Sequence, residues 1–207
     1  MGAVVSRRPS CRAARHRVVR GAWLDSGVGF EPMKRMSAFL IHPLDPSIHR
    51  REDFRCESAE LEAFLRTRAR KEMEAVVSAC FVLVPDVDRG RIAGFYTLSA
   101  AEIEVTALPE GLAKKLPRYP AMPATLLGRL ARDLEFRGQG IGDRLMFNGL
   151  ARAFSTSHEV GSLAVITDPK DEKATAFYRG FHFLPLKSGR MFLPMREIGQ
   201  LLKQRKS

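Results

Sequence analysis

The feature that most constrains this chain is a glycine-rich hexapeptide, Arg137-Gly138-Gln139-Gly140-Ile141-Gly142, which joins an apolar segment at 125–134 to an amphipathic segment at 143–154. Glycine lacks a Cβ, so this backbone can turn tightly and bring several N–H groups close to one anion. The start of a following helix and the Arg137 guanidinium add positive charge there. The hexapeptide predicts a strand, a phosphate-binding turn and a helix. A glycine turn without a ligand is the alternative, because the motif matches neither a P-loop nor a dinucleotide fingerprint.

The composition is that of a basic globular protein. The 207 residues carry a formal net charge of +11, of which the first 35 residues hold +6. The length suits one domain and an appendage. Apolar stretches are far shorter than a membrane span, and Cys11, Cys56 and Cys80 have neither metal-ligand spacing nor an even disulfide framework. We expect a cytoplasmic protein with no metal and no membrane segment.

Residues 1–36 are rich in arginine and contain no apolar run long enough for a secretory signal. We expect disorder in this extension and a folded domain over 37–203. The composition is typical of an organellar transit peptide. A mistaken upstream start codon, with the true start at Met33 or Met36, explains it equally well.

Periodicity and turn residues predict the order of the elements. Strands are expected at 39–44, 79–84, 91–99, 125–134, 162–167, 183–185 and 191–195, and helices at 58–73, 142–155 and 171–178. Ser58 is the expected cap of the first helix. Four prolines between 108 and 123 exclude a long regular element, so a substrate-facing loop with one helical turn is expected there.

Further segments join the hexapeptide in one family resemblance. They are Phe54–Ser58 (FRCES), Gly94–Leu98 (GFYTL), Leu126–Asp133 (LLGRLARD) and Ala176–Phe183 (AFYRGFHF). The combination resembles the GNAT family of N-acetyltransferases and, within it, the toxins of bacterial toxin–antitoxin pairs that acetylate aminoacyl-tRNA. The resemblance covers about Ile41 to Ile198. It implies an α+β fold with a mixed, mostly antiparallel sheet flanked by helices, in which two parallel strands splay apart around acetyl-CoA.

The resemblance also implies where the cosubstrate acetyl-CoA binds. The pantetheine pairs with the backbone of the first splayed strand at Leu130 and Arg132, with Ala131 between them. A backbone N–H near Ala131 or Arg132 holds the acetyl oxygen. Residues 137–142 take the pyrophosphate, and Phe177 belongs to the same site.

Acyl transfer from a thioester to an amine needs a neutral nucleophile and a proton for the departing thiolate. The resemblance makes Tyr178 the acid, whereas spacing alone favours a core tyrosine packed against Phe177 and Phe181. No obvious general base is present, because the candidate carboxylates are of types more often found at surfaces or caps: Glu102, Glu104, Asp133, Asp168 and Asp171. The α-amine of an aminoacyl ester has a pKa near or below about 7.7, against about 10.4 for lysine, so the missing base favours an α-amine acceptor.

Basic side chains are the candidates for the acceptor side. Arg66, Arg70 and Lys71 share one face of the first predicted helix, where they are either solvated or position tRNA phosphates. Arg129 either reaches the acceptor or forms a salt bridge to a glutamate at 102 or 104 across the sheet.

Three functions follow from these features. The first is an acetyl-CoA-dependent toxin that acetylates aminoacyl-tRNA, blocks translation and is neutralised by a ribbon-helix-helix antitoxin. The second is an acetyltransferase of a protein N-terminus or lysine, a polyamine or a small amine. The third is an acyl-CoA-binding module without catalysis, against which Tyr178 and the intact glycine hexapeptide argue. A homodimer is left open.

Overall fold

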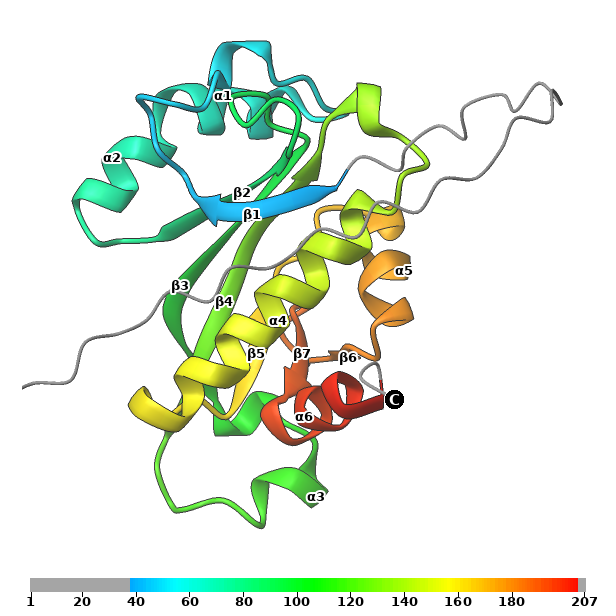
Figure 1. Ribbon diagram of the computed structural model, residues 1–207. Coiled ribbons are helices and arrows are strands. Elements are labelled where there is room, and N and C mark those ends of the chain that lie inside the picture. The colour runs from blue at the N-terminus through cyan, green and yellow to red at the C-terminus, as the bar shows by residue number, and fades with distance from the viewer. Residues whose placement is uncertain (1–37, 205–207) are drawn as a thin grey trace, which may run out of the picture. The chain divides into compact units, whose positions relative to one another are not determined.

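The computed structural model describes residues 38–204, and the extension predicted at 1–36 lies outside them. A seven-stranded sheet has the order β1-β2-β3-β4-β5-β7-β6 (Figure 1). Its strands are β1 (Phe39–Pro43), β2 (Ala79–Pro85), β3 (Gly94–Glu104), β4 (Ala121–Arg132), β5 (Ala164–Thr167), β6 (Leu184–Pro185) and β7 (Met191–Pro194). Neighbouring strands are antiparallel except β4 and β5, which are parallel. The predicted mixed, mostly antiparallel sheet is confirmed.

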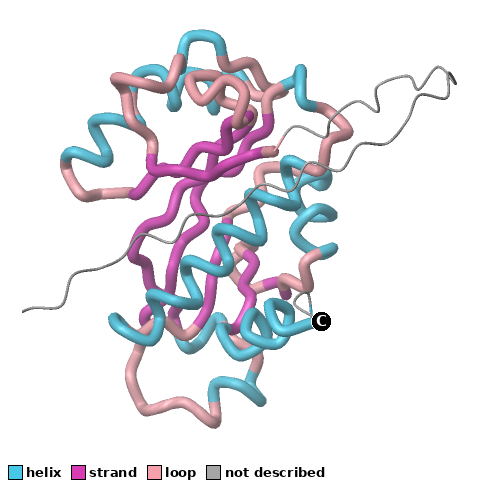
Figure 2. The backbone as a smooth tube through the Cα atoms, in the orientation of Figure 1, coloured by secondary structure: helices cyan, strands magenta, loops and turns pink. Residues whose placement is uncertain are grey.

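Helices cover both faces of this sheet (Figure 2). They are α1 (Ala59–Thr67), α2 (Ala69–Glu74), α3 (Glu110–Ala113), α4 (Ile141–Val160), α5 (Glu172–Gly180) and α6 (Met195–Gln204). Side chains alternate across a strand, so Phe95 and Tyr96 of β3 enter two separate cores, one under α1 and one under α4. Within residues 38–204, no helix combines the length and the apolar character needed to cross a bilayer.

Close packing of α4 on the sheet positions the glycine hexapeptide. Gly94 of β3 allows this approach, because a Cβ there would lie 2.8 Å from Leu145 Cδ1 and 2.9 Å from Ile141 Cγ2. Real Cβ contacts are not that short, so a larger residue would push the helix away. The first turn of α4 is therefore held against the start of β3, where Gly94 pairs with Arg132 at the end of β4.

The helix predicted over 58–73 is broken at Arg68 into α1 and α2. The Thr67 hydroxyl donates a hydrogen bond to the Ala63 carbonyl at 2.7 Å, a back-bond of the kind that weakens and bends helices. Ser58 is the N-cap residue as predicted, but its side chain makes no capping hydrogen bond.

Strand β4 begins at Ala121 rather than at 125, inside the proline-rich segment. The Pro123 carbonyl accepts a hydrogen bond from the Leu163 N–H, just before β5, at 2.8 Å. The nitrogen of a strand residue faces the same side as its carbonyl, so the N–H that Pro123 lacks would not have bonded to β3. The predicted helical turn in this region is α3. Figure 1 places α3 at the opposite end of the sheet from the start of α4. The loop around α3 therefore does not line the cavity described below, and its facing the acceptor substrate stays a prediction.

Candidate active site

The parallel strands β4 and β5 separate after a short pairing. They pair at Thr125 and Leu126 of β4, whereas β4 continues to Arg132 and β5 ends at Thr167. Where the backbones diverge, Thr167 Oγ1 donates a hydrogen bond to the Leu127 carbonyl at 3.0 Å. A cavity of about 250 Å³ opens beside this point. The predicted splayed pair is present.

The free edge of β4 turns backbone polar groups toward this cavity. The Asp133 N–H donates to the Ala93 carbonyl at 2.9 Å, so by alternation Ala131 also directs its backbone groups toward β3. Those of Leu130 and Arg132 face the other way, which agrees with their predicted pairing role. The N–H of Ala131, one of two candidates for holding the acetyl oxygen, is turned away from the cavity.

The glycine hexapeptide needs its glycines for conformation. Gly138 and Gly140 have φ angles of +78° and +67°, and a Cβ at either would meet nothing within 4 Å. Gly140 is the N-cap of the 20-residue helix α4 and provides no side-chain cap, so the first N–H groups of the helix remain open to an anion. Ile141 is buried in the core and offers the site its backbone alone.

The predicted cosubstrate residues divide into two groups. Leu130, Ala131, Arg132, Gly142 and Phe177 line the cavity. Residues 137–141 do not line the cavity but form the turn before Gly142 and the first residue of α4. Gly142 and Phe177 lie in contact, since a Cβ on the glycine would be 3.4 Å from Phe177 Cε2.

Tyr178 lies on the cavity wall near the end of α5 and is 7% exposed. Burial is the largest cause that raises the pKa of Tyr178, and a hydrogen bond with the Thr167 hydroxyl opposes it. The phenol is therefore protonated at neutral pH, at the point where β4 and β5 separate. Its ring also packs 5.4 Å from that of Phe183, centroid to centroid, so Tyr178 is both a core residue and a cavity residue. Thr167 was not singled out from the sequence, where it is merely the polar end of an apolar run.

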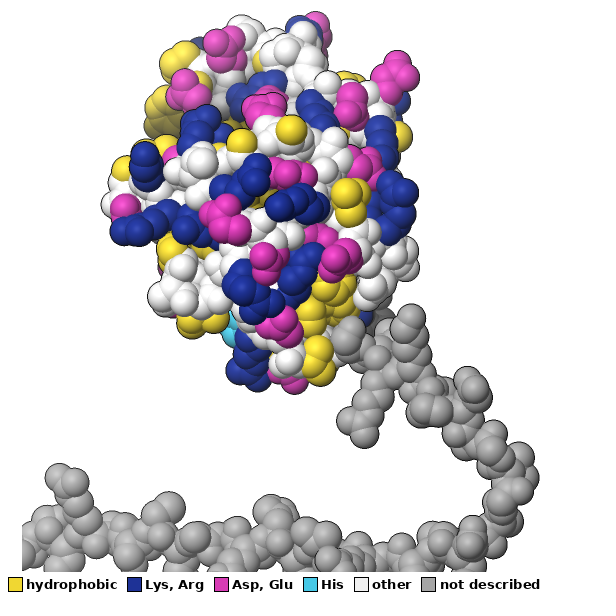
Figure 3. All heavy atoms as spheres, turned by 90° about the horizontal axis from the view of Figure 1, so that it is seen from above, with side chains coloured by type: hydrophobic (Ala, Val, Ile, Leu, Met, Phe, Trp, Pro, Cys, Tyr) yellow, Lys and Arg dark blue, Asp and Glu magenta, His cyan; other side chains and the backbone are white. Residues whose placement is uncertain are grey.

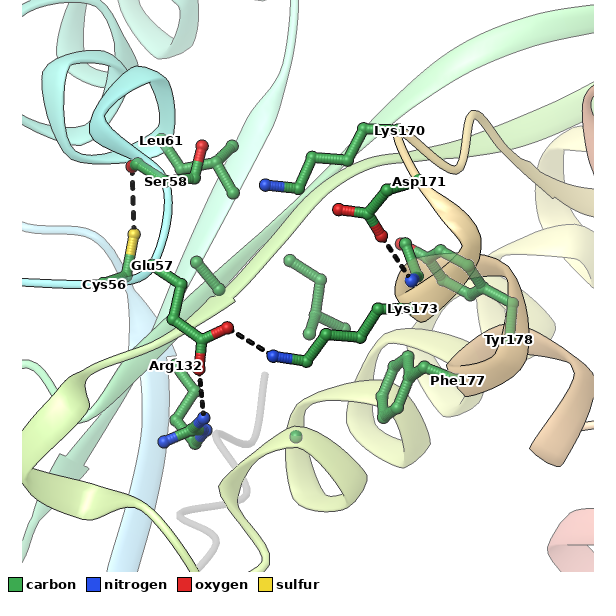
Figure 4. A pocket seen from close by; sticks show the side chains of 14 residues that line it. Cys56, Glu57, Ser58, Leu61, Arg132, Lys170, Asp171, Lys173, Phe177 and Tyr178 are labelled. Atoms are coloured by element: carbon green, nitrogen blue, oxygen red, sulfur yellow. Dashed lines mark hydrogen bonds and ion pairs between the residues drawn. The ribbon is translucent and has the colours of Figure 1, made fainter.

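A charged cluster lies on the cavity wall next to α1 (Figure 4). Glu57, just before α1, pairs with Arg132 at 3.4 Å, with Arg137 at 2.6 Å and with Lys173 of α5. The hydrogen bond from Lys173 is the largest cause that lowers the pKa of Glu57 to about 2. Arg132 Nη1 is buried and has no hydrogen-bond partner in the described part of the chain. The roles of Glu57 and Lys173 could not be read from the sequence, because only the fold brings them together.

Three carboxylates considered as a general base are engaged elsewhere. Asp133 is fully buried and accepts hydrogen bonds from both terminal nitrogens of Arg91, at 3.0 and 3.1 Å. Asp168 pairs with Arg190 at 2.6 Å. The Asp171 side chain caps α5, where it accepts a 2.7 Å hydrogen bond from a backbone N–H. Each therefore has a structural task.

Arg129 pairs with a different glutamate from the one predicted. Its Nη1 lies 3.4 Å from Glu72 Oε2 of α2, and its guanidinium lies 3.7 Å from the centroid of the Phe64 ring. The predicted salt bridge to residue 102 or 104 is wrong, because Arg129 sits opposite Thr97, several residues along the sheet from either glutamate. Arg129 instead ties β4 to α1 and α2.

The other predicted acceptor cations are largely compensated by acids. Arg66 lies 3.8 Å from Glu62, and Arg70 lies 2.7 Å from Glu74. Figure 3 views the molecule from the end where α1 lies, and acidic side chains are interspersed among the basic ones on this face. Lys71 is exposed. The helix face is mostly a solvated one, with Lys71 as its most available cation.

The two cysteines of residues 38–204, Cys56 and Cys80, are free and buried. Burial raises the pKa of Cys80 to about 12. In the same residues, no group of His, Cys, Asp and Glu side chains has the arrangement of a metal site.

Comparisons with known proteins agree with this geometry. The Acetyltransferase (GNAT) family matches residues 46–183, and the chain belongs to this family. A probable toxin TacT of Sinorhizobium fredii is 30% identical over 172 residues, which cover 79% of this chain and 94% of that protein. A tRNA-acetylating toxin of Mycobacterium tuberculosis is 31% identical over 123 residues, which cover 59% of this chain and 71% of that protein.

Solved structures give the same result. AtaT complexed with acetyl-methionyl-tRNAfMet has a TM-score of 0.74 and 28% identity, covering 80% of this chain and 99% of that one. A tyrosine-to-phenylalanine mutant of KacT has a TM-score of 0.74 and 29% identity, covering 79% and 98%. AtaTR bound with AcCoA has a TM-score of 0.70 and 28% identity, also covering 79% and 98%. Similar toxins have also been solved with their antitoxins.

The chain is thus an N-acetyltransferase with the GNAT fold that uses acetyl-CoA. The cavity suits this cosubstrate. Pantetheine carries amides that need backbone partners, and the β4 edge at Leu130 and Arg132 offers them. The phosphates of CoA need donors and cations, which the start of α4 and Arg132 can supply; Arg132 Nη1 is buried and has no hydrogen-bond partner among residues 38–204.

Proposed function

We propose that this chain transfers the acetyl group of acetyl-CoA to the α-amino group of an aminoacyl-tRNA and so blocks translation, as the cytoplasmic toxin of a toxin–antitoxin pair. The observation that carries acyl transfer is the protonated phenol of Tyr178 on the cavity wall where β4 and β5 separate. The acceptor is supported by the similar proteins, which include a tRNA-acetylating toxin and AtaT with an acetylated tRNA. The catalytic domain spans residues 37–203.

Acetyl-CoA supplies the acetyl group as a thioester. The backbone groups of Leu130 and Arg132 bind the pantetheine, and we assign the acetyl oxygen to the Arg132 N–H, because the N–H of Ala131 is turned toward β3. Residues 137–142 bind the pyrophosphate, and Phe177 packs beside it. The amine nitrogen attacks the thioester carbonyl carbon and the C–S bond breaks. Tyr178 gives its hydroxyl proton to the leaving sulfur, and the proton that the nitrogen loses returns to the phenolate through water.

The acceptor amine arrives without a dedicated base. The ionised partners of Asp133 and Asp168 keep these carboxylates in structural ion pairs. An α-amine with a pKa near or below about 7.7 has a substantial neutral fraction at physiological pH, whereas a lysine does not. We propose that Arg129, with Arg66, Arg70 and Lys71, positions the tRNA on the α1–α2 side of the sheet.

The partner of such a toxin is an antitoxin, and we propose a DNA-binding one of the ribbon-helix-helix type. Support comes from similar toxins that have been solved together with antitoxins. Co-purification of the chain with the product of a neighbouring reading frame, followed by mass measurement in solution, tests this partner and the open question of a homodimer together.

Tyr178→Phe tests the catalytic proposal. Purified wild type and variant are incubated with labelled acetyl-CoA and charged tRNA, with free amino acids, polyamines and proteins as other acceptors. We expect label on wild-type aminoacyl-tRNA and a loss of about 10²- to 10⁴-fold in the variant, with acetyl-CoA binding retained. Tyr119→Phe is the matched control, because Tyr119 is 64% exposed on the loop around α3.

Each part of the proposal can fail separately. A variant as fast as wild type would remove Tyr178 from the mechanism. Label on small amines or proteins but not on tRNA would instead assign the chain to the general acetyltransferases.

A further inference from the structure

One carboxylate, that of Glu57, gathers three cations from three different elements at the cavity. Arg132 comes from the end of β4, Arg137 from the glycine hexapeptide and Lys173 from the first turn of α5. Figure 4 shows the Glu57 side chain reaching from the α1 side toward Lys173, which extends from the α5 side. Glu57 thus bridges opposite walls of the cavity.

These cations are the groups that a phosphate would use. Arg137 belongs to the predicted pyrophosphate turn, and Arg132 and Lys173 line the cavity. Three positive charges against one carboxylate leave a local excess of positive charge. Arg132 Nη1 is buried without a partner in the described residues, so the carboxylate does not satisfy the whole cluster. A larger anion with more acceptor oxygens would satisfy it better.

We propose that the Glu57 carboxylate is an internal competitor for the phosphate groups of acetyl-CoA. In the free protein it holds Arg132, Arg137 and Lys173 in ion pairs, and the phosphates of the cosubstrate take over these cations when they bind. Glu57 therefore lowers the affinity for acetyl-CoA and keeps the basic cluster from binding other phosphates. The inference concerns the cosubstrate alone, so it stands or falls independently of the tRNA acceptor.

The location of Glu57 makes this exchange feasible. Its side chain is 39% exposed and that of Lys173 is 75% exposed, so both can move aside without opening the core. Exposed ion pairs contribute little stability each, and a polyvalent phosphate can replace them. A buried pair such as Asp133 with Arg91 would instead resist such an exchange.

Calorimetric binding of acetyl-CoA to wild type and to Glu57→Gln tests the proposal without any turnover. We expect the variant to bind acetyl-CoA about three- to tenfold more tightly, since the phosphates no longer displace a charged competitor. Acetyl-pantetheine, which has the thioester arm but no phosphate, should bind both proteins equally. Glu57→Ala removes the carboxylate by a second route and should tighten binding in the same way.

Glu60→Gln is the matched control, because Glu60 is an exposed glutamate in the first turn of α1. It removes the same charge a short distance away and should leave the Kd unchanged. Weaker or unchanged acetyl-CoA binding in both Glu57 variants would overturn the proposal. If Glu60→Gln tightened acetyl-CoA binding as much as Glu57→Gln, the effect would be one of net charge, and the proposal would be overturned. It would also be overturned if the Glu57 variants bound acetyl-pantetheine more tightly than wild type, because Glu57 would then block the channel instead of competing with phosphate.

Discussion

At the scale of single residues, position rather than acidity distinguishes the functional hydroxyl. Burial raises the pKa of Cys80 to about 12 and also raises the pKa of Tyr178. Both groups keep their protons at neutral pH. Cys80 lies in the core under α1, whereas Tyr178 lies on the cavity wall beside Thr167, so Tyr178 alone of the two can meet a substrate.

Titration of Tyr178 gives the first prediction at this scale. Burial disfavours the phenolate and so raises the pKa of Tyr178 in the folded protein. The contribution of this group to the free energy of unfolding is therefore fully present below the usual tyrosine pKa of about 10, and it is lost as pH rises through the higher folded pKa. The tyrosinate absorbance that Tyr178→Phe removes should therefore appear above the usual tyrosine pKa of about 10. A midpoint for Tyr178 at or below about 10 would contradict this expectation.

Asp133→Asn is predicted to be a stability variant rather than a catalytic one. Asp133 is fully buried and shares the Arg91 guanidinium with Glu135, whose side chain is 75% exposed. Removing a buried partner costs about 3–5 kcal/mol of unfolding free energy. Glu135→Gln should cost less than about 1 kcal/mol, because that pair is exposed. Urea unfolding of the two variants makes the comparison, and equal losses would refute the assigned difference.

At the scale of elements, the sequence predicted those strands and helices that have a strong local sequence pattern. The glycine hexapeptide and the apolar segment before it predicted the start of α4 and the central strand, and β-rich runs around a cluster of turn-forming residues predicted β2 and β3. The helix break at Arg68 was not predicted, because it depends on the hydrogen bond from the Thr67 hydroxyl to the Ala63 carbonyl. The position of Pro123 inside β4 was not predicted either, because it depends on which neighbouring strand the Pro123 carbonyl faces. Helix α6 was not predicted at all, since it follows β7 without a turn signal.

The candidate site was predictable to a different degree. The backbone groups at Leu130 and Arg132 carry no side-chain signature, so only the family resemblance indicated them. Glu57 meets Lys173 and Thr167 meets Tyr178 from separate segments, and both contacts are properties of the tertiary fold. Motifs therefore predict the cosubstrate turn, whereas packing determines the charges around it.

Gly140→Ala is the prediction for an element, the start of α4. Gly140 has a φ of +67° with open space around it, so alanine brings backbone strain of about 1 kcal/mol and no clash. The strain should shift the first N–H groups of α4 and weaken acetyl-CoA binding severalfold in calorimetry. Gly111→Ala in α3 is the control, because its surroundings are also open and its φ is not positive. Equal effects of both changes would show that the left-handed turn is irrelevant to binding.

At the scale of the whole molecule, the residues beyond 35 carry less than half of the net charge. The chain beyond residue 35 carries +5 of the total of +11. Many arginines are held in ion pairs, among them Arg66, Arg68 and Arg70 on α1 and α2. Electrostatic attraction of a tRNA is therefore expected to come from a few uncompensated cations and the overall field.

Salt should consequently affect the tRNA acceptor and spare a small one. Each phosphate contact that releases counterions lowers the logarithm of the affinity by about 0.7–0.9 per tenfold rise in salt, so kcat/KM for aminoacyl-tRNA should fall steeply. The same aminoacyl group on a small ester lacks the phosphates and should show little change. Lys71→Gln should reduce the salt slope for tRNA by about one contact. Lys114→Gln, just after α3 at the other end of the sheet, should leave the slope unchanged, because Lys114 is 78% exposed, pairs with Glu110 and follows a helix that lies away from α2. A slope that is equal for tRNA and the ester, or that responds to Lys114 rather than Lys71, would move the acceptor surface away from α1 and α2.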